Sequence, residues 1–197
     1  ADLVAKLRMA SKGVRDNELQ SVCLASPTGS GKTVIVTAAI EQILQGDDES
    51  APVPDAVFLW LTDMPELNEQ TRRKMATASS ELTEDALVVI DKDFDRETLI
   101  PGHVHFLNIQ KIGKEKSLVT PGDKRRWTIW DTVRNTVQKA PGKFFVVVDE
   151  AHRGMAENGR ARDEARSIVQ KFIKSSPGEI PPVPLIVGVS ATPDRFN

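Results

Sequence analysis

Cysteine is nearly absent from this sequence, and long apolar runs are absent as well. Cys23 is the only cysteine, so a disulfide within the chain is excluded. It lies in a short apolar segment, which predicts a buried side chain that acts as a small hydrophobe. No apolar run approaches the roughly 20 residues that a membrane span needs, and these residues contain no signal-peptide pattern. We therefore expect a cytoplasmic chain without a membrane partner.

The sequence also lacks an excess of charge of either sign. Its 26 basic and 28 acidic side chains give a formal charge of -2. Overall charge therefore does not predict nucleic-acid binding, and any such surface must be a local patch. The 197 residues, 40% hydrophobic and 27% charged, have the composition of one sizeable globular domain.

Short apolar runs alternate with longer helical patterns along the chain. This alternation predicts an α/β fold with a mostly parallel sheet and helices on both faces. Strands are predicted at Val22–Ala25, Ala56–Thr62, Ala86–Ile90, His103–Ile109, Phe144–Asp149 and Leu185–Ser190. Helices are predicted at Thr33–Leu44, Pro65–Ser79, Arg126–Gln138 and Arg160–Lys174. No linker divides the chain, so we expect a single domain over residues 1–197.

The segment "CLASPTGSGKTVIVTAAI" joins a predicted strand to a predicted helix through a glycine-rich loop. It fits the P-loop pattern G-x-x-x-x-G-K-[ST], except that Ser26 stands at the first glycine. Gly29 and Gly31 allow the backbone N–H groups to surround an anion at a helix N-terminus. Lys32 would contact the β- and γ-phosphates of ATP, and Thr33 would ligate Mg²⁺. The predicted nucleotide-binding residues are Ser26, Pro27, Thr28, Gly29, Ser30, Gly31, Lys32 and Thr33.

The segment "FFVVVDEAHRG" supplies the carboxylates that such a loop needs. Five apolar residues precede Asp149, which predicts a central strand whose carboxyl end carries the acid. Ligands of open α/β sheets bind at that edge. Asp149 could hold Mg²⁺ beside Thr33, and Glu150 could accept a proton from the attacking water. With Lys32, these two acids are the predicted catalytic residues.

Three motifs in this order resemble the first RecA-like domain of a superfamily 2 helicase or translocase. They are "SPTGSGKT" at Ser26–Thr33, "DEAH" at Asp149–His152 and "SATP" at Ser190–Pro193. Two looser segments, "LTDMPELNEQ" and "HFLNIQKIG", resemble the helicase (Res) subunit of type III restriction enzymes. The resemblance implies a RecA-like P-loop NTPase in which Leu185–Ser190 lies between the P-loop strand and Phe144–Asp149.

The resemblance also implies roles for residues outside the phosphate loop. His152, Ser190 and Thr192 would couple the state of the nucleotide to the rest of the motor. Strand-end segments that meet the nucleic-acid backbone would include Pro65, Glu66, Asn108, Gln110 and Lys111. Residues 1–20 contain no aromatic side chain for adenine, so the sequence assigns no adenine contact.

The second RecA-like domain of the resembled family, which carries its arginine fingers, is not among these residues. We therefore expect residues 1–197 to be the amino-terminal ATP-binding domain of a longer protein. That protein would hydrolyse ATP, with Mg²⁺, to move along DNA, which we expect to be duplex. Its partners would be the second domain and restriction or modification subunits. Two alternatives stay open: a nucleotide-gated nucleic-acid-binding module without useful turnover, and a DEAH-box RNA helicase.

Overall fold

A computed structural model of the chain describes residues 2–15, 18–27, 29–62, 65–112, 118–122, 125–149, 170–172 and 183–190. Its helices are α1 (Asp2–Arg15), α2 (Lys32–Gln45), α3 (Pro65–Ala78) and α4 (Ile129–Lys139), with short 3₁₀ turns η1 (Glu84–Ala86) and η2 (Ile109–Ile112). Its strands are β1 (Gln20–Ala25), β2 (Val57–Thr62), β3 (Leu87–Val89), β4 (Val104–Asn108), β5 (Phe144–Asp149) and β6 (Leu185–Ser190). Of the predicted helix Arg160–Lys174, only 170–172 are described, and they are helical.

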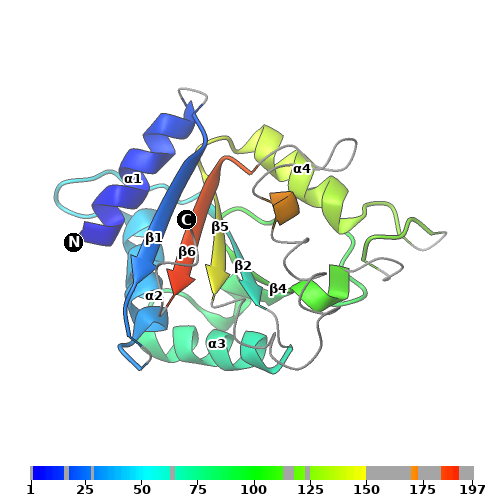
Figure 1. Ribbon diagram of the computed structural model, residues 1–197, viewed down its shortest axis with the longest axis horizontal. Coiled ribbons are helices and arrows are strands. Elements are labelled where there is room, and N and C mark those ends of the chain that lie inside the picture. Colours follow the sequence, from blue (N-terminus) through cyan, green and yellow to red (C-terminus); the bar gives the residue numbers. More distant parts are fainter. Residues whose placement is uncertain are drawn as a thin grey trace.

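The strands form one sheet in the order β1-β6-β5-β2-β4-β3 (Figure 1). Every pair of neighbouring strands is parallel. The predicted insertion of β6 is confirmed, because β6 pairs with β1 through Gln20↔Leu185 and with β5 through Val146↔Ile186. The strand that carries the phosphate loop is therefore separated from the strand that carries Asp149 by one strand.

Two apolar cores lie on opposite faces of the sheet, because side chains alternate between the faces of a strand. In β2, Leu59 belongs to the core that includes Trp130 of α4, whereas Trp60 belongs to the core with side chains of α1, α2 and α3. All residues of β2 are buried, which explains its continuous apolar sequence. The α/β fold with helices on both faces of a parallel sheet is confirmed. Among the described helices, none is long and apolar enough to cross a membrane.

Helix α1 is an element that the sequence analysis did not predict. Its apolar residues recur at helical spacing, and Val4, Leu7 and Val14 are buried in the core shared with α2. Arg8 donates hydrogen bonds of 2.8 Å to the backbone carbonyls of Gln42 and Ala51. The helix is thus attached to the end of α2, and its 3.6-residue apolar period was the signal that could have predicted it.

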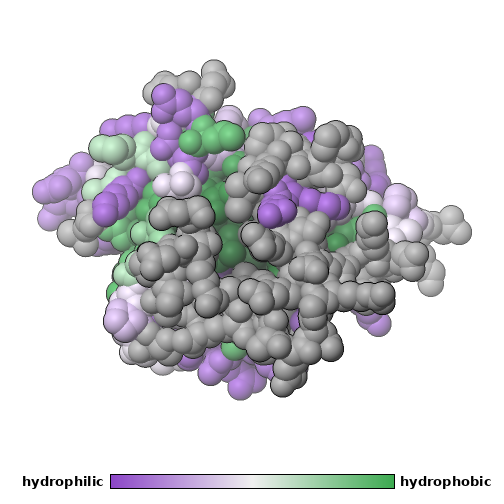
Figure 2. Space-filling model, in the orientation of Figure 1, coloured by the Kyte–Doolittle hydropathy of each residue, from purple (hydrophilic) through white to green (hydrophobic). Residues whose placement is uncertain are grey.

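The prediction that Cys23 is buried is wrong, because β1 is an edge strand of the sheet. Residues of β1 alternate between half-buried and exposed. Val22 and Leu24 pack against the core with α1 and α2, and Cys23 faces the opposite side. Seen from the side of β1 and β6, the surface carries a band of apolar residues beside hydrophilic ones (Figure 2).

Helix α4 begins at Ile129, three residues later than predicted, because Thr128 provides an N-cap. The Asp131 N–H donates to Thr128 Oγ1 at 3.2 Å, and the Thr128 N–H donates to Asp131 Oδ2 at 3.0 Å, which completes a capping box. The preceding N–H groups of Arg126 and Trp127 donate to the Asp95 carboxylate instead. These hydrogen bonds hold the chain in a non-helical turn before the cap.

Candidate nucleotide-binding site

The carboxyl ends of three adjacent strands bring together residues that are far apart in the sequence. Ala25 of β1 pairs with Ser190 of β6, and Asp149 of β5 pairs with Val189. Parallel strands end at one edge of a sheet, which is where ligands of open α/β sheets bind. Strands β1, β6 and β5 end on the same side of the sheet (Figure 1). The predicted phosphate loop, Asp149 and Ser190 therefore share this edge.

The phosphate loop has the backbone conformation that its glycines predict. Gly29 and Gly31 have φ angles of 82° and 75°. Residues other than glycine rarely adopt such positive φ angles. A Cβ atom at either position would meet nothing within 4 Å, so the left-handed backbone, not lack of space, requires glycine here. Gly31 is the N-cap of α2, with no side-chain cap and no acidic residue in the first turn. The positive end of this helix is therefore left for an anion.

The loop is closed on itself by its own polar groups. The Lys32 ammonium donates to the carbonyl oxygens of Ser26 at 3.0 Å and Pro27 at 3.1 Å. The Ser26 hydroxyl donates to Ser30 Oγ at 2.7 Å, and the Ser30 N–H donates to Pro27 O at 3.2 Å. The two serine hydroxyls form a contact that the sequence pattern did not predict, since that pattern places glycine at position 26.

Thr33 and Asp149 provide the oxygen donors for the predicted metal. Thr33 lies in the first turn of α2 and is half-buried, and Asp149 is half-buried at the end of an otherwise buried strand. A hydroxyl and a carboxylate are hard oxygen ligands of the kind that Mg²⁺ takes together with phosphate oxygens and water. The donor set therefore fits Mg²⁺ bound with a nucleotide. Glu150 and Thr28 lie outside the described residues.

Of the three predicted coupling residues, only Ser190 lies within the described residues, and His152 and Thr192 lie outside them. Ser190 is completely buried, and its carbonyl oxygen accepts a 3.1 Å hydrogen bond from the Ser26 N–H. The end of β6 is thus bonded directly to the first residue of the phosphate loop.

The predicted nucleic-acid residues do not share one environment. Glu66 and Gln110 are exposed, whereas Asn108 is completely buried. Asn108 Oδ1 accepts the Gln110 N–H at 2.9 Å, which caps the turn η2, and its Nδ2 atom is buried without a partner in the described structure. Lys111 donates to the Ile90 carbonyl at 3.2 Å. Pro65 begins α3.

A buried polar pair on β2 and α3 was not predicted. Thr62, at the end of β2, donates to Asn68 Oδ1 at 2.5 Å, and both side chains are buried. Thr62 pairs directly with Asn108 on β4. These buried polar groups lie at the carboxyl ends of β2 and β4. They therefore anchor the two segments that the resemblance assigns to nucleic-acid contact.

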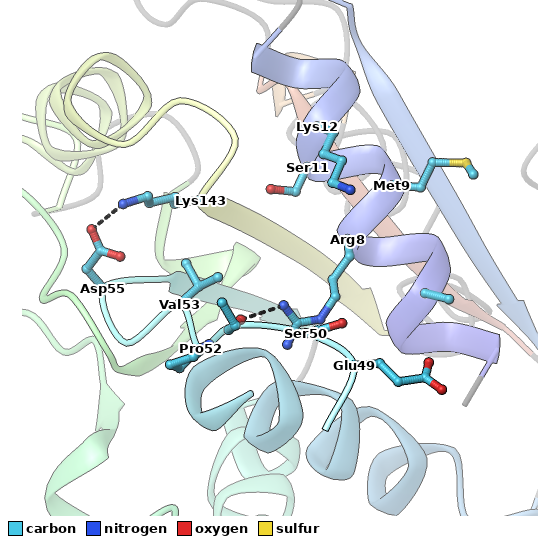
Figure 3. A pocket seen from close by; sticks show the side chains of 12 residues that line it. Arg8, Met9, Ser11, Lys12, Glu49, Ser50, Pro52, Val53, Asp55 and Lys143 are labelled. Carbon is cyan, nitrogen blue, oxygen red and sulfur yellow. Dashed lines mark hydrogen bonds and ion pairs between the residues drawn. The ribbon is translucent and has the colours of Figure 1, made fainter. Parts of the chain in front are cut away.

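A cavity of about 860 Å³ lies elsewhere in the molecule, between α1 and the 49–55 segment. Figure 3 shows Ser11 and Lys12 of α1 on one side and the ion pair of Lys143 and Asp55, at 2.6 Å, on another. Lys143 immediately precedes β5, and Asp55 lies two residues before the start of β2, so this cavity lies at the amino edge of the sheet. It is separate from the edge that carries the phosphate loop.

A glycine-rich loop at a helix start, beside an acidic strand end on a parallel sheet, defines a RecA-like α/β domain of the P-loop type. Residues 2–195 match the family described as type III restriction enzyme, res subunit. The chain belongs to this family, as the sequence motifs predicted. No curated protein sequence matches the chain.

Solved structures of helicases and a restriction enzyme are similar to the chain. It is 18% identical to Saccharomyces cerevisiae Dbp5 bound to RNA and ADP BeF3, with a TM-score of 0.47, covering 95% of this chain and 40% of that one. For the Pyrococcus furiosus Hef helicase domain the identity is 16% and the TM-score 0.49, covering 98% and 34%. A third similar structure is a nuclease-deletion mutant of the type ISP restriction-modification enzyme LlaGI in complex with a DNA substrate mimic. Its sequence identity to this chain is 14% and the TM-score is 0.48, and the match covers 98% of this chain and 17% of that one. The chain thus spans less than half of each of these proteins.

Proposed function

We propose that this chain is the ATP-binding motor domain of a DNA helicase or translocase. It would hydrolyse ATP to ADP and phosphate when joined to a second RecA-like domain. The observation that carries the proposal is the left-handed glycine loop at the start of α2, on the same sheet edge as Asp149. That arrangement supports the proposal, because backbone N–H groups at a helix N-terminus favour an anion such as a triphosphate.

The proposed site assigns a separate task to each side chain. Lys32 would leave the carbonyls of Ser26 and Pro27 and bind the β- and γ-phosphates. Thr33 and Asp149 would hold Mg²⁺, which neutralises charge on the phosphate oxygens when it is bound. Glu150 would orient the attacking water and accept its proton.

DNA is proposed as the partner because the family is that of a restriction enzyme subunit. The exposed residues Glu66 and Gln110, at the start of α3 and after β4, support a contact surface on the carboxyl edge. His152, Ser190 and Thr192 would link that surface to the nucleotide. Restriction or modification subunits are further proposed partners of the complete protein.

Phosphate release from the full-length protein tests this function. With MgATP, duplex DNA should stimulate release, and Glu150→Gln should reduce it at least about a hundredfold, because a general base contributes on that order. Nucleotide binding should be retained. Glu49→Gln is the matched control, since Glu49 is exposed in the loop after α2, away from the phosphate loop.

The other outcomes separate the alternatives. Stimulation by RNA and not by DNA would favour an RNA helicase. Nucleotide-dependent DNA binding without turnover in the full-length protein would favour a nucleotide-gated binding module. Absence of MgATP binding would contradict both the proposal and these alternatives.

A further inference from the structure

The groups that a phosphate would use are already engaged within the loop. Lys32 Nζ lies on two backbone carbonyl oxygens, those of Ser26 and Pro27. The Ser30 N–H, which belongs to the loop that would surround the phosphate, donates to the same Pro27 carbonyl at 3.2 Å. A nucleotide that uses the Lys32 ammonium would therefore replace its two bonds to backbone carbonyls.

The hydroxyl contact between Ser26 and Ser30 reinforces this closed loop. At 2.7 Å it has the length of a normal O–H···O hydrogen bond. It joins the first residue of the loop to the residue before Gly31. The P-loop pattern has glycine at position 26, and glycine has no side chain that could make this bond.

The closed loop is anchored at its base independently of these hydroxyls. The Ser26 N–H donates to Ser190 O at 3.1 Å, and this bond uses backbone atoms alone. Replacing the Ser26 side chain should therefore leave the loop attached to β6 and change only the closure.

We infer that Ser26 and Ser30 form a latch that holds the phosphate loop closed and lowers its apparent affinity for nucleotide. This inference rests on the proposed nucleotide site. A ligand that binds one of two states has an affinity reduced by the fraction of molecules in the competent state. The latch stabilises the state that is not competent, so its removal raises that fraction. One neutral hydrogen bond corresponds to roughly a two- to tenfold change in this equilibrium.

The test measures MgADP and MgATP affinity and association rate for the full-length protein and four variants. Ser26→Ala and Ser30→Ala should each bind nucleotide roughly two- to tenfold more tightly, with faster association. The double variant should gain no more than either single variant, because both remove the same bond. Ser21→Ala, which changes an exposed serine on the strand β1 that precedes the loop, should match the parent.

Each result decides between the latch and another role. Weaker binding in Ser26→Ala would overturn the latch and indicate that the hydroxyl contacts the ligand. Unchanged affinity would overturn it while leaving the proposed function standing. Additive gains in the double variant would show that the two hydroxyls act separately, which also contradicts it. A parent that binds no nucleotide would overturn both proposals, so the two failures are distinguishable. Thermal unfolding without nucleotide verifies that each variant is folded.

Discussion

The Lys32 ammonium has a structural role in the loop and a second role in the proposed chemistry. In the closed loop it neutralises the partial negative charge of two carbonyl oxygens, and in the proposed complex it would neutralise phosphate. Hydrogen bonds to a charged group contribute more than neutral ones because both Coulomb attraction and alignment favour them.

Lys32→Ala should weaken MgATP binding at least about tenfold, since it removes a charged donor from a multiply charged ligand. Isothermal titration calorimetry on the full-length protein measures this directly. Lys12→Ala is the control, because Lys12 is an exposed cation of α1 that lines the cavity at the amino edge. Equal affinities of Lys32→Ala and the parent would contradict the assignment.

His105 shows how burial controls a titratable residue that the proposed chemistry does not use. Burial is the main cause that lowers the pKa of His105 to about 4. Its Nε2 atom accepts the Ile100 N–H at 3.1 Å, so the neutral ring carries its proton on Nδ1, facing the Phe58 carbonyl. A proton on Nε2 would break the Ile100 hydrogen bond.

Stability should therefore fall on mild acidification. The folded pKa of about 4 is below the ordinary value of 6.5, so the unfolded chain takes up the proton first as pH falls. The stabilisation is fully present above pH 6.5 and is lost towards pH 4, by about 2 kcal/mol between about pH 7.5 and about pH 5. Urea unfolding at these two pH values measures the difference. The control variant His103→Asn should show the same loss of stability between the two pH values. An unchanged free energy of unfolding in the parent would refute the assignment of this loss to His105.

At the scale of the element, helix ends depend on individual side chains that periodicity does not identify. Thr128 and Asp131 begin α4 with a reciprocal pair of hydrogen bonds, and Arg134 pairs with Asp131 at 2.8 Å. The helix buries Trp130 against Phe172, with ring centroids 5.4 Å apart. The cap therefore fixes where the buried face of α4 starts.

Thr128→Ala should lower the free energy of unfolding by about 1 kcal/mol, because the N–H of Asp131 loses its acceptor. Thr77→Ala, an exposed threonine inside α3, should be neutral or slightly stabilising, since alanine has the higher helix propensity. Denaturant unfolding of both variants gives the comparison. An equal loss of unfolding free energy in Thr77→Ala and Thr128→Ala would show that the N-cap contributes no more than an ordinary helical threonine.

At the scale of the whole molecule, the described fold presents one edge of a parallel sheet to the proposed ligands. The phosphate loop, Asp149 and Ser190 meet there, and the predicted nucleic-acid segments follow β2 and β4 on the same edge. Phosphoryl transfer also needs positive charge on the γ-phosphate in the transition state. Lys32 and Mg²⁺ would supply part of it, and the resemblance assigns the rest to a second domain.

Residues 1–197 alone should bind nucleotide yet hydrolyse it slowly, with little stimulation by DNA. An arginine finger from a second domain contributes on the order of a thousandfold or more in rate. Phosphate release from these residues, measured beside the full-length protein, tests the expectation. If the two matched in DNA-stimulated rate, the requirement for a second domain would have to be abandoned.

Much of the fold follows from local sequence, for a physical reason. Apolar runs form buried strands wherever both faces of a parallel sheet are covered, so the strand around Phe144–Asp149 and its acidic end were predictable from residues close in sequence. Gly29 and Gly31 require left-handed backbone, and this requirement is also local. The order of the motifs predicted the family.

Tertiary structure alone decided which side chains those elements expose or bury. Cys23 lies on an edge strand and is exposed, although its apolar neighbours suggested burial. Asn108 is buried and caps the turn η2, and the resemblance that assigns it to nucleic acid does not indicate this burial. The sequence determined that a phosphate loop exists at Ser26–Thr33. Only the packed loop determined that Ser26 meets Ser30 and that Lys32 meets two carbonyls, because such contacts depend on how the chain closes in space.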